Sequence, residues 1–342
     1  MEYERHPTLY YQDGDIALSA KRTDNTSRWL VFKVDKVYLL RSSPIFRDML
    51  SLPPAAGVNE KYDGVPLVVF PDPAEAVEHL LSVLYSPAGL SLRPKDPDNP
   101  IHVVGLTRLA IKYEIEVLRD AIFQQIAADW PEDLASWDAR IAEEKLCQEA
   151  LSLDHESYDK DTLDEIFPEP AAAINFGLEF GVHSMLPAAF YRLATIPAHQ
   201  DWDVYRNMDH PNYGDHWSDL YDGLRTAHWG SLSSQVLMHL ILLREELKGQ
   251  TREIISTFSL LHDKCAKRVS CKKTKAELLK NYLSSPSESR FSDPMTVLKR
   301  LLDQTENWEI CRLCKWFTRD KLLLVRQGVW STVVKTVVPE SS

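Results

Sequence analysis

The sequence predicts an α+β N-terminal domain, in which a small mixed sheet is flanked by helices, followed by a mainly α-helical C-terminal region. Two β-favouring runs, residues 16–20 and 29–34, enclose a polar turn and predict a hairpin. Apolar residues then recur at helical spacing over most of the remaining chain. With 342 residues, 44% of them apolar, the chain is long enough to build more than one packed core.

The N-terminal elements follow the hairpin directly. Helical spacing predicts a helix over residues 36–41, and Pro44 begins a second helix because its missing N–H costs nothing in a first turn. Phe46 and Met49 are predicted to be core residues of this second helix. Further elements are predicted as a strand over residues 66–70 and helices over residues 73–85, 101–113 and 115–126.

The end of this unit is marked by Asp129, Trp130 and Pro131, because the residue before a proline is disfavoured in a helix. We therefore predict a first domain of residues 1–130 and a helical region of residues 131–342. Gly249 is predicted to end a helix that begins near residue 231. Two loops are predicted in the helical region, an acidic one over residues 152–170 and one over residues 284–294. Other helices are predicted over residues 171–194, 295–302 and 308–325.

The N-terminal residues follow a pattern of acidic, apolar and basic types that resembles the BTB/POZ domain. The residues that carry the resemblance are Asp15, Ile16, Leu18, Phe32, Val34, Lys36, Leu39, Ser43, Phe46, Arg47 and Met49. The likeness is greatest to the BTB-containing proteins that mushroom-forming (basidiomycete) fungi carry in large numbers. In those proteins, segments similar to residues 63–68, 84–87 and 112–114 recur. This chain has Asp35 before Lys36 where most BTB domains have His, so no role of that His is transferred.

The resemblance implies a non-enzymatic protein–protein interaction module that self-associates, acts as an adaptor, or both. BTB adaptors of cullin-type ubiquitin ligases carry a hydrophobic-x-Glu motif ahead of their third strand, and Val58, Asn59 and Glu60 have this form and place. The alternative interpretation is a solvated loop glutamate. The partners that the resemblance implies are therefore proteins, namely a second copy of the chain and a cullin scaffold.

A dimer surface is predicted from what the first short helix leaves uncovered. Leu9, Tyr10 and Tyr11 are expected to form a short extra strand. In an isolated domain, Tyr38, Leu39 and Leu9 are expected to be partly exposed. An apolar patch of this kind is normally an interface. Twofold pairing is the commonest way to cover such a patch.

The net charge of −11 is unevenly distributed. Residues 131–230 contain 6 basic and 20 acidic side chains, whereas residues 231–342 contain 19 basic and 12 acidic ones. One interpretation is two solvated faces that attract each other, and the other is a nuclear transcription regulator with a basic nucleic-acid contact over residues 264–280. We expect no nucleic-acid partner, because the acidic segment competes for the same Lys and Arg residues.

Four of the five cysteines form two pairs, Cys265 with Cys271 and Cys311 with Cys314, and the second pair has the CxxC spacing of zinc ligands. His262 is a candidate to replace a missing ligand. The alternative is that the cysteines are small buried apolar residues without metal. A structural zinc ion is the only cofactor for which the sequence offers a pattern, and organic cofactors are not expected.

The remaining patterns argue against other classes of protein. No run of about 18 apolar residues and no apolar leader segment occurs, so neither membrane insertion nor export is expected and the chain is predicted to be intracellular, in the cytoplasm or nucleus. An odd number of cysteines agrees with reduced thiols. No phosphate-binding loop, nucleophile elbow or metalloprotease motif is present, so no catalytic residues and no enzymatic activity are predicted.

Overall fold

The structure is a computed structural model that describes most of the chain as two compact units. The described residues are 2–23, 28–51, 60–86, 90, 92–153, 161–211, 213–284 and 293–337. One unit consists of residues 1–94 and 99–126, and the other of residues 95–98 and 127–342. The predicted boundary after residue 130 lies close to this division. Among the described helices, none combines the length and apolarity needed to cross a membrane.

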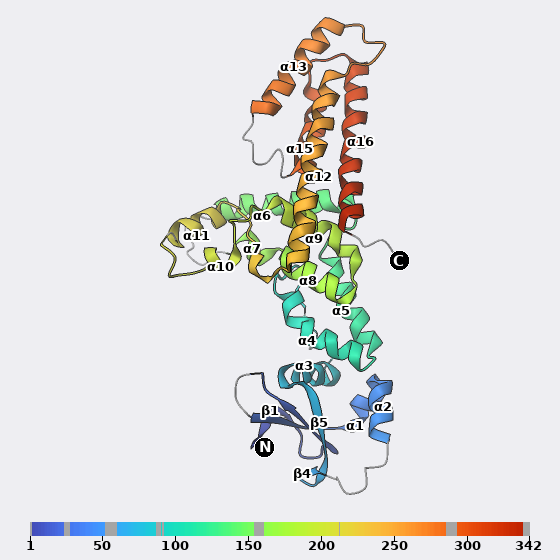
Figure 1. The fold of residues 1–342 in the computed structure, drawn as a ribbon, viewed down its shortest axis with the longest axis vertical. Coiled ribbons are helices and arrows are strands. Elements are labelled where there is room, and N and C mark those ends of the chain that lie inside the picture. Colours follow the sequence, from blue (N-terminus) through green and yellow to red (C-terminus); the bar gives the residue numbers. More distant parts are fainter. Residues whose placement is uncertain are drawn as a thin grey trace. The chain divides into compact units, whose positions relative to one another are not determined.

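The first unit contains a five-stranded mixed sheet (Figure 1). Its strands are β1 (Glu2–Tyr10), β2 (Ile16–Lys21), β3 (Arg28–Val34), β4 (Lys61–Tyr62) and β5 (Val65–Pro73). They lie in the order β1-β3-β2-β5-β4. The predicted hairpin is formed by β2 and β3, which are antiparallel, with Leu18 opposite Phe32. β5 runs parallel to β2 on the other side, so β2 is central and its residues 16–20 are buried.

The N-terminal strand β1 is longer than the short strand predicted around residues 9–11. It begins at Glu2 and pairs in parallel with β3 of the same chain. Leu9 at its end is only 5% exposed. The prediction that Leu9 is partly uncovered is therefore wrong, because pairing within the chain turns this side chain inward.

The helices described in the first unit are α1 (Lys36–Ser42), α2 (Pro44–Ser51), α3 (Ala74–Tyr85), α4 (Asn99–Lys112) and α5 (Glu116–Ala128). Ser43 connects α2 to the end of α4. Its hydroxyl accepts a hydrogen bond from the Phe46 N–H at 3.0 Å and donates one to the Tyr113 carbonyl at 2.5 Å. The bond from the Phe46 N–H satisfies one of the otherwise free N–H groups at the start of α2.

Phe46 is fully buried, as predicted, and stacks on the ring of Tyr113 with 4.3 Å between ring centroids. Met49 is only half-buried, so the prediction that it is a core residue is wrong. The two residues are three positions apart, and α2 presents only the Phe46 side of its apolar face to the core. Periodicity identified the face but not how deeply each residue lies in it.

A second hairpin joins β4 and β5, where only a strand over residues 66–70 is predicted from the sequence. Lys61 pairs with Pro66 and Tyr62 with Val65 across a two-residue turn. The turn residues Asp63 and Gly64 have φ angles of +50° and +83°. Two consecutive positive φ angles suit an Asp-Gly turn and match the twist of the strands. The Asp-Gly pair was therefore a usable signal for this hairpin.

The second unit is helical wherever its regular structure is described. Its helices of ten residues or more are α6 (Leu134–Leu153), α8 (Pro170–Phe180), α9 (Leu186–Thr195), α12 (Ser234–Ser259), α13 (Arg268–Ser284), α15 (Pro294–Gln304) and α16 (Arg312–Val337). Shorter helices are α7 (Leu163–Ile166), α10 (Trp202–Tyr205) and α11 (Tyr213–Tyr221). The predicted combination of an N-terminal sheet with helices and a mainly helical remainder is thus confirmed.

The two longest helices, α12 and α16, pack side by side, and α13 packs against α12 (Figure 1). The prediction that α12 ends at Gly249 is wrong, because the helix continues to Ser259. Leu247, Ile254 and Phe258 are all buried along it. A glycine inside a helix costs about 1 kcal/mol, and the burial of these apolar side chains outweighs that cost. The last helix starts at Arg312 and ends at Val337, later at both ends than predicted.

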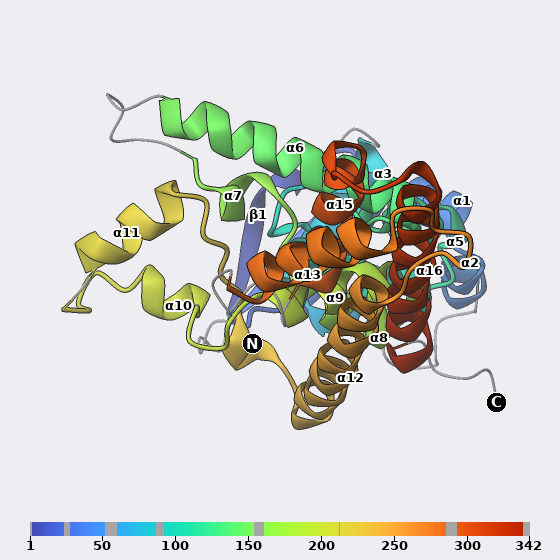
Figure 2. The same ribbon diagram turned by 90° about the horizontal axis from the view of Figure 1, so that it is seen from above.

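The acidic segment predicted as a loop over residues 152–170 is only partly a loop. Residues 154–160 lie outside the described part, but α7 follows from Leu163 and packs against α6 and α11 (Figure 2). Asp164 is 1% exposed. Its carboxylate accepts hydrogen bonds from Arg225 Nε at 2.8 Å and from the Thr226 hydroxyl at 2.5 Å. The prediction of a loop is wrong over residues 163–166, which form α7, because basic and polar groups from a distant segment compensate the buried charge of Asp164.

The loop predicted over residues 284–294 falls mostly on residues 285–292, which lie outside the described part. After it, the Asp293 carboxylate accepts a hydrogen bond from the Thr296 N–H at 3.1 Å and caps α15. The same carboxylate accepts the hydroxyl of the buried Tyr191 at 2.7 Å. The end of the predicted loop is therefore anchored to α9.

We predict that Phe46→Ala lowers the free energy of unfolding of the first unit by about 3–5 kcal/mol, because it leaves a cavity beside Tyr113. Met49→Ala is the matched control and should cost clearly less, since Met49 is half-buried. Hydrogen exchange of peptides from β2 and β3 in the full chain measures both changes. Equal protection in Phe46→Ala and in the parent would contradict this assignment of the core.

We also predict that Asp164→Asn destabilises the second unit by about 3–5 kcal/mol, because it removes the close carboxylate partner of the buried Arg225 and leaves only the longer ion pair with Glu144 at 3.9 Å. The control is Asp161→Asn, an exposed carboxylate nearby, which should change stability by about 0.5 kcal/mol or less. Urea unfolding followed by tryptophan fluorescence compares the two variants. Similar midpoints for both would show that the Asp164 ion pair does not stabilise the fold.

Candidate metal centre

The four paired cysteines of the sequence come together in the second unit. The sulfur atoms of Cys265, Cys271, Cys311 and Cys314 all lie within 4.8 Å of one another. The Sγ atoms of Cys265 and Cys311 are 3.7 Å apart. Cys311 is half-buried and the other three are buried, and all four are free thiols rather than disulfides. The two pairs predicted from spacing are thus one cluster.

Each sulfur is placed by the end of a helix. Cys265 lies in the turn between α12 and α13, where its N–H donates to the His262 carbonyl at 2.9 Å. Cys271 lies in the first turn of α13. Cys311 directly precedes α16, and Cys314 lies in its first turn. Two helix N-termini therefore point their partly positive ends at the cluster, which favours negative charge on sulfur.

Backbone N–H groups also donate to the sulfur atoms. The Cys311 N–H donates to Cys271 Sγ at 3.2 Å. A hydrogen bond from the Cys314 N–H lowers the pKa of Cys311 to about 7. Burial raises the pKa of Cys314 to about 12, although the His262 N–H donates to it, and burial also raises the pKa of Cys271. The surroundings of Cys311 therefore favour its thiolate form.

Lys275, one turn after Cys271 on α13, is completely buried. Its ammonium group donates to the Thr257 carbonyl at 2.8 Å, to the Leu260 carbonyl at 2.5 Å and to the Thr318 hydroxyl at 3.0 Å. Burial lowers the pKa of Lys275 to about 8, while the neighbouring Cys314 and Cys271 act in the opposite direction. In the sequence, Lys275 stands out only as part of a basic stretch. Its spacing of four from Cys271 was the available signal.

His262, the candidate replacement ligand, is not part of the cluster of sulfur atoms. Its Nδ1 atom accepts a hydrogen bond from the Lys264 N–H at 3.1 Å, and its ring lies edge-on to Phe317. The backbone of His262 contacts the cluster instead. Its N–H donates a hydrogen bond to Cys314, and its carbonyl accepts one from the Cys265 N–H. Four sulfur atoms are available without it.

The predicted partner-binding residues of the first unit lie in different environments. Leu39 is fully buried, so the prediction that it is partly exposed is wrong; α1 packs against α2 and α3. Tyr38 is 39% exposed and Glu60 is exposed. Val58 and Asn59 lie outside the described residues. Leu39 therefore cannot contact a partner, whereas Tyr38 and Glu60 remain available.

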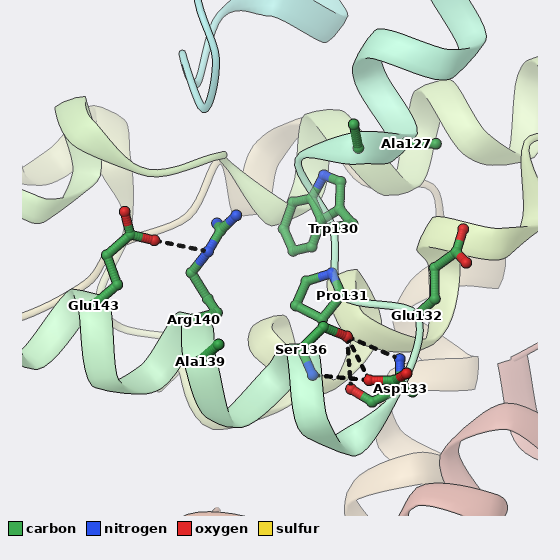
Figure 3. Close-up of a pocket in the computed structure, with 10 residues that line it drawn as sticks. Ala127, Trp130, Pro131, Glu132, Asp133, Ser136, Ala139, Arg140 and Glu143 are labelled. Carbon is green, nitrogen blue, oxygen red and sulfur yellow. Dashed lines mark hydrogen bonds and ion pairs between the residues drawn. The ribbon is translucent and has the colours of Figure 1, made fainter.

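A pocket of about 560 Å³ in the second unit is lined by residues between positions 127 and 143 (Figure 3). Four of its polar side chains form two bonded pairs. Arg140 forms an ion pair with Glu143 and also donates to the Asp129 carbonyl at 2.9 Å. The Ser136 hydroxyl donates to the Asp133 carboxylate at 2.7 Å. The Arg140 and Ser136 groups that face this pocket serve to hold α6 in place, so the thiol cluster is the stronger candidate for a site.

Comparison of the chain with protein-family models finds no match, and comparison with curated proteins finds no relative. Function is therefore argued from the geometry of the chain itself.

Proposed function

We propose that the chain is a non-enzymatic protein-interaction protein whose first unit is a BTB-like domain. The observation that supports this most directly is where the residues that carry the resemblance lie. Seven of them are fully buried in the first unit: Ile16, Leu18, Phe32, Val34, Leu39, Ser43 and Phe46. A sequence motif whose members build the core of a compact unit supports a shared fold more strongly than scattered surface identities do.

The polar residues of the motif also have a structural role. α1 begins at Lys36, and the preceding Asp35 makes no side-chain cap. The Asp15 carboxylate, from the turn before β2, accepts the Lys36 N–H at 2.7 Å instead. This bond satisfies the first N–H of the helix and favours its N-terminus electrostatically. This bond gives Asp15 a structural reason to belong to the pattern, whereas Lys36 contributes only its backbone N–H to it.

An interaction surface is proposed on α1, where Val37 is 42% and Tyr38 is 39% exposed. The Tyr38 ring packs on Tyr85 with 4.2 Å between centroids, and Tyr85 stacks on Tyr11 at 4.9 Å. The Tyr85 hydroxyl in turn donates to the Asp35 carboxylate at 3.0 Å. Tyr38 is therefore held in place before any partner binds, which reduces the entropy cost of association.

We propose that this face, called the α1 face and comprising Val37 and Tyr38, mediates self-association of the chain. Because β1 pairs with β3 of its own chain, association through α1 needs no exchange of strands. The exposed area is smaller than the sequence analysis expected, since Leu39 and Leu9 are buried. A dimer held by the α1 face is therefore expected to be of modest affinity.

Tyr38→Asp is predicted to abolish this dimer, because it places a charge in the centre of an apolar contact. Light scattering of the full chain over a concentration series measures the mass. The measured mass of the parent should rise towards that of two chains at high micromolar concentration, and the mass of the variant should stay at that of one chain. Val117→Asp, which changes an 86% exposed residue of α5, is the control and should behave as the parent does. A parent that stays monomeric contradicts the proposal.

A cullin scaffold is proposed as a further partner through the segment around Glu60. The support is the motif itself and the exposure of Glu60 next to β4. The rival proposal is a regulator that contacts nucleic acid through residues 264–280. It is supported by the position of the seven basic residues in that segment, of which all but Lys275 are exposed. Asp263 and Glu277, also exposed, reduce the local charge of this surface.

One capture experiment distinguishes these two partners. We predict that the tagged full chain retains a purified cullin scaffold, and that Glu60→Arg loses it. The matched charge reversal on the basic surface, Lys272→Glu with Lys273→Glu, should leave cullin capture unchanged. Retention of duplex DNA with a steep salt dependence, lost in the lysine variant, would instead support the nucleic-acid contact.

A further inference from the structure

The sulfur atoms of the cluster are spaced as a tetrahedral metal ion would hold them. Zinc bonds to cysteine sulfur at about 2.3 Å, which places the sulfurs of a tetrahedral site about 3.8 Å apart. Cys265 and Cys311 are 3.7 Å apart, and no pair in the cluster exceeds 4.8 Å. A disulfide needs about 2.05 Å, far shorter than the 3.7 Å observed. The four sulfurs therefore surround a point rather than forming bonded pairs.

We propose that Cys265, Cys271, Cys311 and Cys314 bind one structural Zn²⁺ ion as a tetrathiolate site, with Lys275 as its compensating cation. Four protein ligands close the tetrahedron and leave no position for water or substrate, so the ion is structural rather than catalytic. Thiolate sulfur is a soft ligand that selects zinc over calcium or magnesium. The site does not depend on the interaction function proposed above, since it belongs to the other unit.

The surroundings of the sulfurs fit a site that carries negative charge. A Zn²⁺ ion with four thiolates has a net charge of −2. The N–H groups of Cys311, Cys314 and His262 donate to the sulfurs, and the N-termini of α13 and α16 face them. Such outer contacts orient the ligands and disperse their charge. Buried apolar cysteines without metal would need none of these donors.

Lys275 is the strongest indication that the cluster carries charge. It is 0% exposed, and no carboxylate forms an ion pair with it among the described residues. An unpaired buried ammonium group is costly even when it is hydrogen-bonded. Lys275 lies one turn after Cys271 on α13, and Thr318 lies one turn after Cys314 on α16. The Lys275 ammonium donates to the Thr318 hydroxyl, so both residues lie next to the cysteines. A tetrathiolate one turn away supplies the negative charge that Lys275 otherwise lacks.

The ion would cross-link three helix ends that are distant in sequence. Cys265 follows α12, Cys271 begins α13, and Cys311 and Cys314 begin α16. Cys265 and Cys311 are 46 residues apart. The ammonium of Lys275 bonds to the Thr257 and Leu260 carbonyls at the end of α12 and so joins the same assembly. Loss of the metal is therefore expected to loosen the ends of all three helices together.

The first test measures the metal in the full chain purified without chelator. Native mass spectrometry and elemental analysis should give one zinc per chain, and a thiol-modifying reagent should release it. Cobalt added to the stripped protein should produce the thiolate charge-transfer and ligand-field absorption of a tetrahedral sulfur site. A folded chain without metal, or one that holds iron in place of zinc, overturns the assignment without requiring any variant to fold.

The second test assigns the ligands. Cys265→Ser should lose the zinc, whereas Cys147→Ser should keep it, because Cys147 lies on α6 outside the cluster. His262→Ala should also keep one zinc per chain, since its side chain is not a ligand. Full zinc in Cys265→Ser, or loss of zinc in Cys147→Ser, contradicts the proposed ligand set.

The third test concerns Lys275, which we assign as a positioning residue. Lys275→Gln keeps hydrogen-bond donors but removes the charge, and Lys275→Met removes both. If the charge compensates the thiolates, both variants should bind zinc about 10–100-fold more weakly than the parent in a competition with a chromogenic chelator. If Lys275→Gln binds zinc as tightly as the parent does, Lys275 acts only as a hydrogen-bond donor and its assignment as compensating cation is wrong.

Discussion

The cost of burying an unpaired charge is the constraint that orders the second unit. Asp164 is buried against Arg225, and Glu144 forms a close ion pair with Arg192. Arg326 of α16 forms a bidentate pair with Asp138 of α6, 188 residues earlier in the chain. Each pair joins elements that are distant in sequence, and removing one partner of such a pair is far more damaging than losing an exposed one. Lys275 is a fully buried cation that no carboxylate pairs with among the described residues. The zinc–thiolate site that we propose would supply its negative partner.

The interactions that hold the second unit together differ between the long helices and the region around the cysteines. Along α12 and α16, buried apolar residues such as Leu243, Leu322 and Val329 provide the packing. Near the cysteines the exposed surface is rich in lysine, and the buried rings of Phe258, Tyr282 and Trp308 pack together beneath it. A bound metal ion would add folding free energy to that of this aromatic packing. A zinc ion would thus allow α13, whose surface is strongly basic, to remain docked on α12.

The first unit depends on a smaller set of contacts that link its sheet and helices. Ser43 connects the start of α2 to the end of α4, and Asp15 caps α1. The Tyr113 hydroxyl donates to the Asp72 carboxylate at 2.6 Å, which ties the same point to the end of β5. These bonds fix α1 relative to the sheet. They leave Val37 and Tyr38 on the outer side of α1 exposed, which is the surface that we propose for self-association.

Local patterns in the sequence determined the hairpin of β2 and β3, the start of α2 at Pro44, the core position of Phe46 and the pairing of cysteines by spacing. Each depends on neighbours within about two helical turns or on one strand, where periodicity and proline stereochemistry act directly. The tertiary structure alone decided that both cysteine pairs meet, that Lys275 and Asp164 are buried, that Leu39 is covered and that Met49 is not. Depth of burial depends on which distant elements pack over a residue, and a charged side chain is tolerated inside only when a remote segment supplies its partner. Neither condition is visible in the order of residues along the chain.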